Sequence, residues 1–296
     1  MQIAVLMSTY NGSNFIREQI DSIINQENVE VSLYIRDDGS TDGTIHILEE
    51  YQKQFEFVHY IRGKNLGPAL SFLELIQMDI EAEYYALSDQ DDIWLPDKLA
   101  SAIEKLKYYN EPAMYYSALQ LIDQNGTLLK DGQIIPDEIN QHNVLYGFFV
   151  TGCTVVYNCM LADVLRKYKP KEFYMHDAWI ACVAVFTGKT VLDKTAHIMY
   201  RQHANNVVGM KKKRKLRKKI DDFFRKNAHR HENLACNLLQ GYAQYLEYNQ
   251  KTELELMSCY RKSVKNWLAL YTCSTVNKLP ANLKKSCKRM IVFRTF

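Results

Sequence analysis

The sequence predicts an α/β fold with a doubly wound, mixed but mainly parallel sheet and a helical C-terminal extension. Three observations lead to this prediction. Strand-like and helix-like periods alternate over residues 1–107, polar clusters follow the ends of the strands, and no strand-length run of β-forming residues occurs after residue 210. The 296 residues are 47% hydrophobic and 24% charged, which is enough apolar material for one large domain plus an appendage.

The first four strands are predicted from short apolar or alternating runs. Between them, apolar residues recur at helical spacing, as they do at Phe15, Ile20 and Ile23. The predicted order is strand 3–9, helix from 15, strand 29–36, helix around 45–48, strand 57–61, helix 69–78 and strand 84–88. Strands that alternate with helices run parallel and are joined by right-handed crossovers.

After Lys107 the pattern changes to shorter strands and loops, with a strand over 113–121 and an apolar stretch over 144–157. From about residue 211 the pattern is helical. The sequence therefore predicts one domain over 1–209, with halves at 1–107 and 108–209, and a helical region over 210–296.

The net charge of +3 hides a local excess, because residues 211–219 hold eight basic side chains and no acidic one, leaving 3 − 8 = −5 elsewhere. Apolar residues follow at helical spacing, at Leu216, Ile220, Phe223 and Phe224. This pattern suits a helix on an anionic membrane surface, at roughly 1 kcal/mol per basic residue. A helix packed on the protein with solvated lysines explains it equally well. No nucleic-acid reader motif accompanies the charge, so no nucleic-acid partner is expected.

The seven cysteines are odd in number, scattered and without a Cys-x-x-Cys pair, which argues against a disulfide framework and a zinc cluster. A reducing cytosol fits this usage. No apolar stretch reaches the roughly 18 to 20 residues of a membrane span, and the N-terminus does not have the pattern of a signal peptide. We therefore expect a cytoplasmic protein whose membrane contact, if any, is peripheral.

An acidic cluster, Asp89-Gln90-Asp91-Asp92, follows the predicted strand 84–88. Three carboxylates within four residues repel one another unless a cation or ligand offsets them. Oxygen ligands of this kind suit Mn²⁺ or Mg²⁺, which proteins usually hold with one or two carboxylates plus substrate phosphates. The alternative is an ordinary turn and capping cluster before the next helix.

A second acidic pair, Asp37-Asp38, follows the predicted strand 29–36, and a polar run from Ser8 to Asn11 follows the first strand. Ligands of parallel α/β sheets bind beyond the carboxyl ends of the strands, so these clusters are expected at one edge. Asp and Ser also populate ordinary turns. Together, however, the clusters indicate a nucleotide bound across the sheet edge.

Three motifs carry a family resemblance: Ser-Thr-Tyr-Asn-Gly from Ser8, Asp-Asp-Gly-Ser-Thr-Asp-Gly-Thr from Asp37, and Ser-Asp-Gln-Asp-Asp-Ile-Trp-Leu-Pro from Ser88. In this order and spacing, residues 2–206 resemble a family 2 glycosyltransferase of the GT-A fold. The resemblance implies that Asp89-x-Asp91 binds the metal, with Asp91 the direct ligand. The residues it implies for the nucleotide are Ser8, Thr9, Tyr10, Asn11, Asp37, Asp38 and Asp89.

The segment from Phe173 to Trp179 is similar to the family region that supplies the general base, and Asp177 matches that role. A carboxylate can take the proton of the acceptor hydroxyl as it attacks the anomeric carbon, which inverts the configuration. Alternatively, Asp177 caps a helix that begins near Ala178. Asp92, Trp94, His176 and Trp179 adjoin the motifs and are candidates for a sugar or acceptor pocket, although tryptophans pack in cores more often.

The segment 199–209 is similar to a Tyr-Arg-x-His-x-x-Asn-x-x-Gly segment of rhamnosyltransferases. Arginine binds phosphate bidentately and neutral histidine binds Mn²⁺, so Arg201 is assigned to the donor diphosphate and His203 to the metal. A structural role is the alternative for each.

The resemblance thus implies a GT-A catalytic domain over 1–209, with a nucleotide-binding half at 1–107 and an acceptor half at 108–209. The expected reaction moves rhamnose or a hexose from a UDP- or dTDP-sugar to a lipid-linked carbohydrate acceptor in bacterial surface polysaccharide synthesis. A noncatalytic nucleotide-sugar-binding or membrane scaffold protein is one alternative, which the intact acidic residues disfavour. A nucleotidyltransferase is another, but residues 8–13 lack its basic, glycine-rich phosphate loop.

Overall fold

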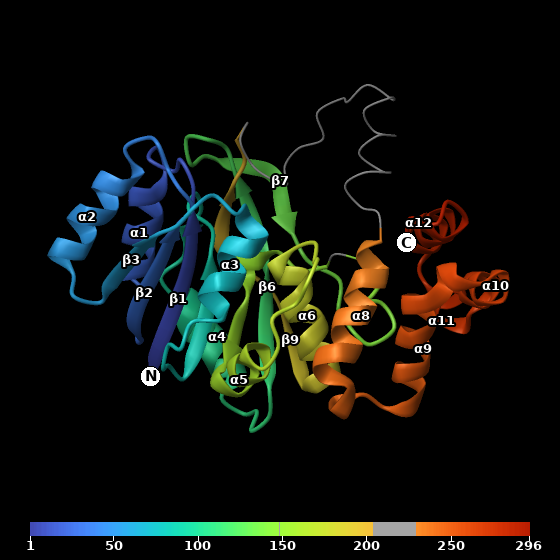
Figure 1. Cartoon of the computed structure of the whole chain (residues 1–296). Helices are drawn as coiled ribbons and strands as arrows, with labels where there is room; N and C mark the ends of the chain where they lie inside the picture. The colour runs from blue at the N-terminus through green and yellow to red at the C-terminus, as the bar shows by residue number, and fades with distance from the viewer. Residues whose placement is uncertain (148, 204–228) are drawn as a thin grey trace. The chain divides into compact units, whose positions relative to one another are not determined.

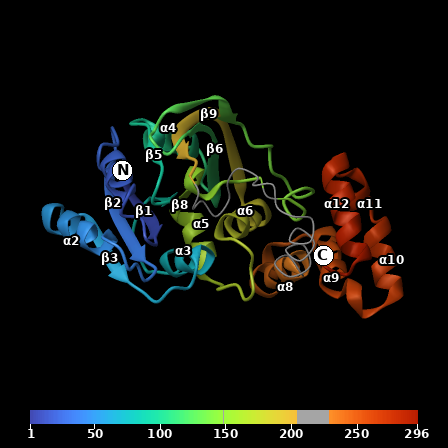
Figure 2. The same ribbon diagram turned by 90° about the horizontal axis from the view of Figure 1, so that it is seen from above.

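A computed structural model describes residues 1–147, 149–203 and 229–296, shown in Figure 1 and, from above, in Figure 2. The chain divides into two compact units. Among the described residues, the first unit comprises 1–138, 150–166 and 188–203, and the second comprises 139–147, 149, 167–187 and 229–296. Two internal segments thus group with the C-terminal helices in the second unit. The expected boundary at 209–210 lies outside the described residues.

The first unit is built on a nine-stranded sheet with the order β3-β2-β1-β4-β8-β6-β9-β5, and β7 pairs with β6. Strand β1 pairs in parallel with β2 and β4, β2 with β3, and β6 with β9, while the other pairs are antiparallel. The strands are β1 (Gln2–Thr9), β2 (Glu30–Asp37), β3 (Val58–Arg62), β4 (Tyr84–Ser88), β5 (Ile93–Trp94), β6 (Ala113–Ile122), β7 (Leu128–Ile134), β8 (Val156–Asn158) and β9 (Lys189–Arg201).

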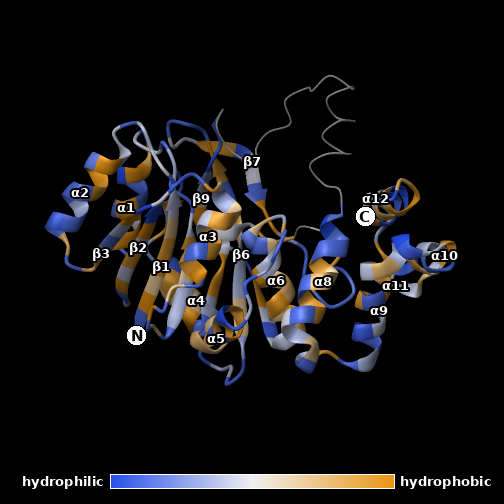
Figure 3. Cartoon of the chain, viewed as in Figure 1, coloured by the Kyte–Doolittle hydropathy of each residue, from blue (hydrophilic) through white to orange (hydrophobic). Residues whose placement is uncertain are grey.

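Helices cover both faces of this sheet. Along β1, Ile3, Val5 and Met7 point to the face where one hydrophobic cluster collects the buried residues of α1 (Ile16–Ile24), α2 (Thr44–Gln54) and α4 (Lys98–Leu106). Helices α3 (Pro68–Ile76) and α5 (Cys159–Arg166) contact strands of the sheet and each other, and Figure 2 shows them on the opposite face. Hydrophobic residues run along β1 and β2, whereas α2 alternates between hydrophilic and hydrophobic turns (Figure 3).

The predicted fold class is confirmed: the sheet is mixed, mainly parallel among its first strands, and followed by helices. The predicted strands 3–9, 29–36, 57–61 and 84–88 correspond to β1 to β4. In its described residues, the apolar stretch 144–157 contains turns, the short 3₁₀ helix η1 (Gly152–Thr154) and the start of β8. Residues buried on all sides show no period, so the sequence did not predict that β8 enters the sheet antiparallel between β4 and β6.

The second unit is helical in its described residues. Its helices are α6 (His176–Thr187), α8 (Arg230–Tyr242), α9 (Tyr248–Cys259), α10 (Val264–Thr272), α11 (Ser274–Lys278) and α12 (Ala281–Val292), with 3₁₀ turns η2 (Ala243–Tyr245) and η3 (Tyr260–Lys262). The unit has an aromatic core in which Trp179 packs against Tyr168 and Tyr242. The basic segment 211–219 and the apolar residues that follow it lie outside the described residues.

Candidate active site

The polar motifs meet at one edge of the sheet because β1, β2 and β4 are parallel neighbours. Thr9, the last residue of β1, is in register with Asp37, the last residue of β2. The amide of Asp38 donates a hydrogen bond of 2.8 Å to the Thr9 carbonyl oxygen. One residue earlier, the Ser8 hydroxyl donates to Ser71 Oγ at 2.6 Å. The segments expected to bind the nucleotide therefore lie side by side.

Gln90 joins this edge to the acidic loop that follows β4. Its Oε1 accepts hydrogen bonds from Thr9 Oγ1 at 2.6 Å and from the amide of Tyr10 at 2.8 Å. Its Nε2 donates back to the Tyr10 carbonyl oxygen at 3.2 Å. The Tyr10 ring remains 46% exposed at the edge. The sequence analysis gave Gln90 no role, although its place between acidic residues was a signal that it lies at the site.

Asp37 shapes the turn after β2. Its side chain is buried, and Oδ2 accepts hydrogen bonds from the amides of Gly39 at 3.0 Å and Ser40 at 2.9 Å. Gly39 has φ +86°, which disfavours residues with a side chain. Asn11 crosses to the same turn: its amide donates to Ser40 Oγ and its Oδ1 accepts from the Thr41 amide, both at 2.8 Å. These side chains fix the turn at which the nucleotide is expected to bind.

Asp38 is also buried, and its carboxylate binds other groups of the protein. Its carboxylate pairs with the Arg36 guanidinium at 2.5 Å and accepts hydrogen bonds from the amides of Leu66 and Gly67. Arg36 is 5% exposed, so the pair is largely removed from water. Asp38 therefore fixes the loop between β3 and α3, and the sequence analysis did not identify Arg36 as its partner.

Asp91 and His203 face each other at the same edge. His203 Nε2 lies 2.7 Å from Asp91 Oδ2, and the two side chains are only 9% and 15% exposed. The imidazole stacks on the Phe15 ring, with centroids 4.8 Å apart. The carboxylate and imidazole that the sequence nominated as metal ligands are thus adjacent, although they are 112 residues apart in the chain.

Arg201 connects the elements around that pair. Its backbone amide donates to Asp92 Oδ1 at 3.0 Å, and its Nε donates to the Asp91 carbonyl oxygen at 2.8 Å. The guanidinium also donates to the Gln124 carbonyl oxygen at 3.0 Å and pairs with Glu18 at 2.5 Å. The residue is 1% exposed, so its guanidinium is directed into the protein and organises the acidic loop.

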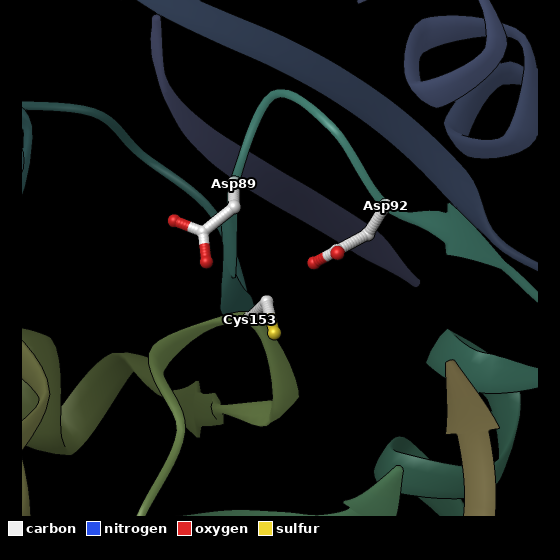
Figure 4. A group of neighbouring side chains, drawn as sticks. All are labelled: Asp89, Asp92 and Cys153. Atoms are coloured by element: carbon white, nitrogen blue, oxygen red, sulfur yellow. The ribbon is translucent and has the colours of Figure 1, made fainter. Parts of the chain in front are cut away.

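Asp89, Asp92 and Cys153 form a second group of possible ligands, drawn in Figure 4. Asp89 and Asp92 come from the loop between β4 and β5, and Cys153 comes from η1. Asp92 is completely buried, and its pKa is raised well above the usual value, first by burial and then by the charges of Asp91 and Asp89. The sequence analysis placed Asp92 in the sugar or acceptor pocket and did not identify Cys153.

The residues at this edge fit a divalent cation. Asp91 supplies a carboxylate oxygen and His203 an imidazole nitrogen 2.7 Å away, both ligand types that Mn²⁺ accepts, and Asp89 adds a further carboxylate on the same loop. Asp92 Oδ2 is buried, and the Cys153 thiol is the side-chain donor that acts on this carboxyl group. Positive charge stabilises an acidic loop of this kind.

Trp94 packs in the core of the first unit. The side chain is 3% exposed and belongs to the main hydrophobic cluster. The Lys98 ammonium lies 3.6 Å from the centroid of a Trp94 ring. Lys98 is fully buried, and burial lowers its pKa to about 7. Trp94, which the sequence suggested for sugar binding, therefore packs in the core and makes a cation–π contact with Lys98.

Asp177 lies in the second unit, within the first turn of α6, and is partly exposed. Its Oδ1 accepts a hydrogen bond of 2.7 Å from the Ala178 amide. The helix begins at His176, two residues before Ala178, so Asp177 lies inside its first turn, where the helix dipole stabilises a carboxylate. His176 is buried, and burial lowers its pKa to about 3, so its ring is neutral.

Trp179 follows on the same helix and is 1% exposed. It lines a small pocket within the second unit, together with aromatic and apolar residues and the Arg230 and His231 side chains. The lining on either side of Asp177 includes Met175 and Ala178. The candidate base therefore lies next to a pocket with aromatic walls.

Comparison with known proteins identifies the class. A model of glycosyl transferase family 2 matches residues 4–165, which include every motif of the sheet edge except the segment of Arg201 and His203. The chain belongs to this family. It is accordingly a glycosyltransferase with a nucleotide-sugar donor.

Individual relatives agree with this placement. The dTDP-rhamnosyl transferase RfbG of Shigella flexneri is 31% identical over 215 residues, covering 69% of this chain and 73% of RfbG. The putative teichuronic acid biosynthesis glycosyltransferase TuaG of Bacillus subtilis is 28% identical over 155 residues, covering 52% of this chain and 60% of TuaG.

Two solved structures share the GT-A fold. S. aureus TarS 1-349, crystallised with UDP-GlcNAc, is similar over 100% of this chain and 82% of its own, with a TM-score of 0.62 and 17% identity. The mannosyltransferase PcManGT of Pyrobaculum calidifontis, in complex with GDP-Man and Mn²⁺, covers 99% and 80%, with a TM-score of 0.50 and 15% identity.

Proposed function

We propose that the protein is an inverting, metal-dependent glycosyltransferase that moves rhamnose or another hexose from a dTDP- or UDP-sugar to a carbohydrate acceptor. The observation that carries the proposal is the pair of Asp91 and His203, 2.7 Å apart at the edge where β1, β2 and β4 end. The name of RfbG supports a dTDP-rhamnose donor, and the UDP-GlcNAc complex of TarS supports a UDP-sugar. The Mn²⁺ complex of PcManGT supports the metal.

In this proposal Asp91, Asp89 and His203 hold the cation. When bound, a divalent cation neutralises the charge that develops on the departing diphosphate. Arg201 keeps the acidic loop in place and adds positive charge behind it. The nucleotide lies on the edge residues already described, Ser8, Thr9, Tyr10, Asn11, Asp37 and Asp38. The buried carboxylates of this set act by fixing the turns that contact the base and ribose, since both are hydrogen-bonded to backbone amides.

Asp177 is the proposed general base. Its carboxylate takes the proton of the acceptor hydroxyl while the hydroxyl oxygen bonds to the anomeric carbon and the diphosphate leaves from the opposite face. A single displacement of this kind inverts the anomeric configuration. The partial exposure of Asp177 suits a group that must reach a substrate. His176 and Trp179 would contribute to the acceptor side, and Asp92 and Trp94 would support the sugar site from behind.

The acceptor is proposed to be a growing surface polysaccharide on a lipid carrier. The name of TuaG, a putative teichuronic acid biosynthesis glycosyltransferase, supports a role in bacterial surface polysaccharide synthesis. None of the helices among the described residues is long and apolar enough to cross a membrane. The basic segment 211–219 would then hold the enzyme on the cytosolic surface of the membrane by charge attraction and its apolar neighbours. We assign the catalytic role to residues 1–209 and this anchoring role to the region that follows.

A thermal-shift panel tests the proposed function. UDP-, dTDP- and GDP-sugars are added with and without Mn²⁺ to the wild type, to Asp91→Ala and to Asp79→Ala, an exposed carboxylate of the same unit. A donor at about 100 times its Kd should stabilise the native state by about 2.7 kcal/mol. We expect a Mn²⁺-dependent shift with one nucleotide, lost in Asp91→Ala and kept in Asp79→Ala. No shift with any donor would favour the noncatalytic scaffold.

A further inference from the structure

A thiol lies among the carboxylates of the acidic loop. One ligand atom each of Asp89, Asp92 and Cys153 can be chosen so that all lie within 4.8 Å of one another. Figure 4 shows the Asp92 carboxylate directed from its loop toward the side of the loop where Asp89 and Cys153 lie. The grouping follows from the topology: β8 runs antiparallel beside β4, so η1, immediately before β8, lies at the end of β4 from which the acidic loop departs.

The buried carboxylate of Asp92 is only half satisfied. Its Oδ1 accepts a hydrogen bond from the Arg201 amide, whereas Oδ2 is buried and the side-chain donor acting on this carboxyl group is the Cys153 thiol. The nearby thiol of Cys153 is a weak donor and replaces little of the lost hydration. A buried carboxylate with only a weak donor is unfavourable unless a positive charge offsets it or the group binds a proton. The site therefore favours a cation that accepts oxygen and sulfur ligands.

We propose that Asp89, Asp92 and Cys153 form a second metal site, for a thiophilic divalent cation such as Zn²⁺, distinct from the pair Asp91 and His203. Three protein ligands and one water give the four-coordinate geometry that zinc prefers, with Zn–S near about 2.3 Å and Zn–O near about 2.1 Å. The ligand atoms lie within 4.8 Å of one another, and the partly exposed Asp89 side chain can rotate to bring its oxygen to ligand distance. On binding, the thiol proton passes to solvent and the thiolate becomes the ligand.

The chemistry of the two sites separates their metals. Carboxylate and imidazole at Asp91 and His203 suit Mn²⁺, whereas a thiolate selects softer cations. Asp89 belongs to both sets. Zinc at the thiolate site would withdraw Asp89 from the donor site, so low concentrations of Zn²⁺ should inhibit a reaction supported by Mn²⁺. The inference goes beyond the proposed transfer reaction, and its binding readout does not depend on activity.

Lys98 offers a competing source of positive charge. Its ammonium is buried, its charge acts on both Cys153 and Asp92, and it makes no hydrogen bond to a described residue. If this cation alone offsets the Asp92 carboxylate, the thiol has no need of a metal. The two explanations differ in whether Cys153 binds a cation in solution.

Cobalt titration of the full chain distinguishes them, because a thiolate bound to Co²⁺ gives a charge-transfer band in the near ultraviolet. We expect one equivalent of Co²⁺ to produce the band in the wild type, and Zn²⁺ to remove it. Cys153→Ser should lose the band, whereas Asp91→Ala should keep it. Cys182→Ser, which alters another buried thiol in α6, is the matched control and should also keep it.

Absence of the band from folded wild type, or its persistence in Cys153→Ser, would overturn the proposal and leave Lys98 as the internal counter-ion. Circular dichroism and the melting temperature establish that each variant folds. If Cys153→Ser does not fold, cadmium NMR of the wild type replaces it: a signal typical of one thiolate and oxygen ligands supports the site, and a signal typical of oxygen and nitrogen ligands refutes it. These outcomes are independent of the donor panel.

Discussion

At the scale of single residues, Arg201 is the side chain on which most of the candidate site depends. It contacts the loop of Asp91 and Asp92, the turn at Gln124 and Glu18 of α1, and its guanidinium carbon lies 4.9 Å from the Phe15 ring centroid. Phe15 in turn stacks on His203. The buried Arg201 side chain thus helps to position both proposed metal ligands, Asp91 and His203. From the sequence, Arg201 was expected to bind the donor diphosphate. In the structure its described hydrogen bonds go to other residues of the protein.

Replacing Arg201 should weaken metal binding as well as the fold. Arg201→Met leaves the carbonyl oxygens of Asp91 and Gln124 without a donor, at a cost of roughly 1–3 kcal/mol for each buried group. We expect a lower melting temperature and at least a tenfold weaker Mn²⁺ affinity by calorimetry. Arg201→Lys keeps the charge but not the forked geometry, so it should recover stability in part and metal affinity less. Unchanged Mn²⁺ affinity in a folded Arg201→Met protein would show that Arg201 has only a structural role.

Asp177 tests the assignment of the general base. Asp177→Asn keeps the shape of the side chain and removes its ability to take a proton, so turnover should fall by about 100-fold or more while donor binding is unchanged. Sugar transfer and the donor-induced thermal shift are measured on the same preparations. Glu255→Gln, an exposed carboxylate on α9 of the same unit, serves as the control. Wild-type turnover in Asp177→Asn would refute the assignment.

At the scale of elements, Gly188 allows the chain segments directly before β6 and β9 to approach each other closely. A Cβ added at this residue, directly before β9, would lie 1.9 Å from the Pro112 carbonyl oxygen, directly before β6. The same carbonyl accepts the Lys189 amide at 2.9 Å, which starts the parallel pairing of β6 and β9. Since β9 ends at Arg201, the start of this strand pairing helps to place Arg201 against the acidic loop.

Gly188→Ala should therefore destabilise the first unit. The backbone of Pro112 must shift, and overpacking of this kind typically costs roughly 1–3 kcal/mol. Urea unfolding measures the loss of free energy. Gly43→Ala is the matched control, because a Cβ there would meet only Ser13 Cβ at 3.7 Å. Equal stability of the two variants would show that the strand entries relax at little cost.

At the scale of the whole molecule, the distribution of charge predicts where the enzyme works. The segment 211–219 carries eight basic residues, while the remainder of the chain has a formal charge of −5, since 3 − 8 = −5. Electrostatic attraction to an anionic membrane surface is local and screened by salt. The balance therefore favours one attachment point and not general adhesion of the protein to anionic surfaces.

Vesicle binding tests this attachment. Replacing Leu216, Ile220, Phe223 and Phe224 with Ser should release the protein from anionic vesicles in a flotation assay, because the apolar face is lost and the charge remains. Wild-type binding should weaken as salt is added. Val264→Ser with Leu268→Ser removes exposed apolar residues of α10 and is the control. Retention of the fourfold variant on vesicles would contradict the anchoring role.

The sequence by itself determined the local elements and the order of the polar motifs. Strands β1 to β4 are short apolar runs ended by polar turns, and this signal depends only on neighbouring residues. The same rule, that parallel strands end at one edge, predicted that Asp37, Asp38 and the acidic loop would meet. The helical character of residues 229–296 could also be predicted from the sequence, because it depends on local periodicity.

Tertiary structure decided which partners those residues meet. Gln90 bonds to Thr9 across 81 positions and Arg201 to the Asp91 carbonyl across 110, and no local pattern specifies such pairs. Cys153 joins the acidic loop only because β8 enters the sheet antiparallel beside β4. Local propensity is set by each residue and its neighbours, whereas burial, pairing and the pKa of a group such as Asp92 depend on the side chains that packing brings around it.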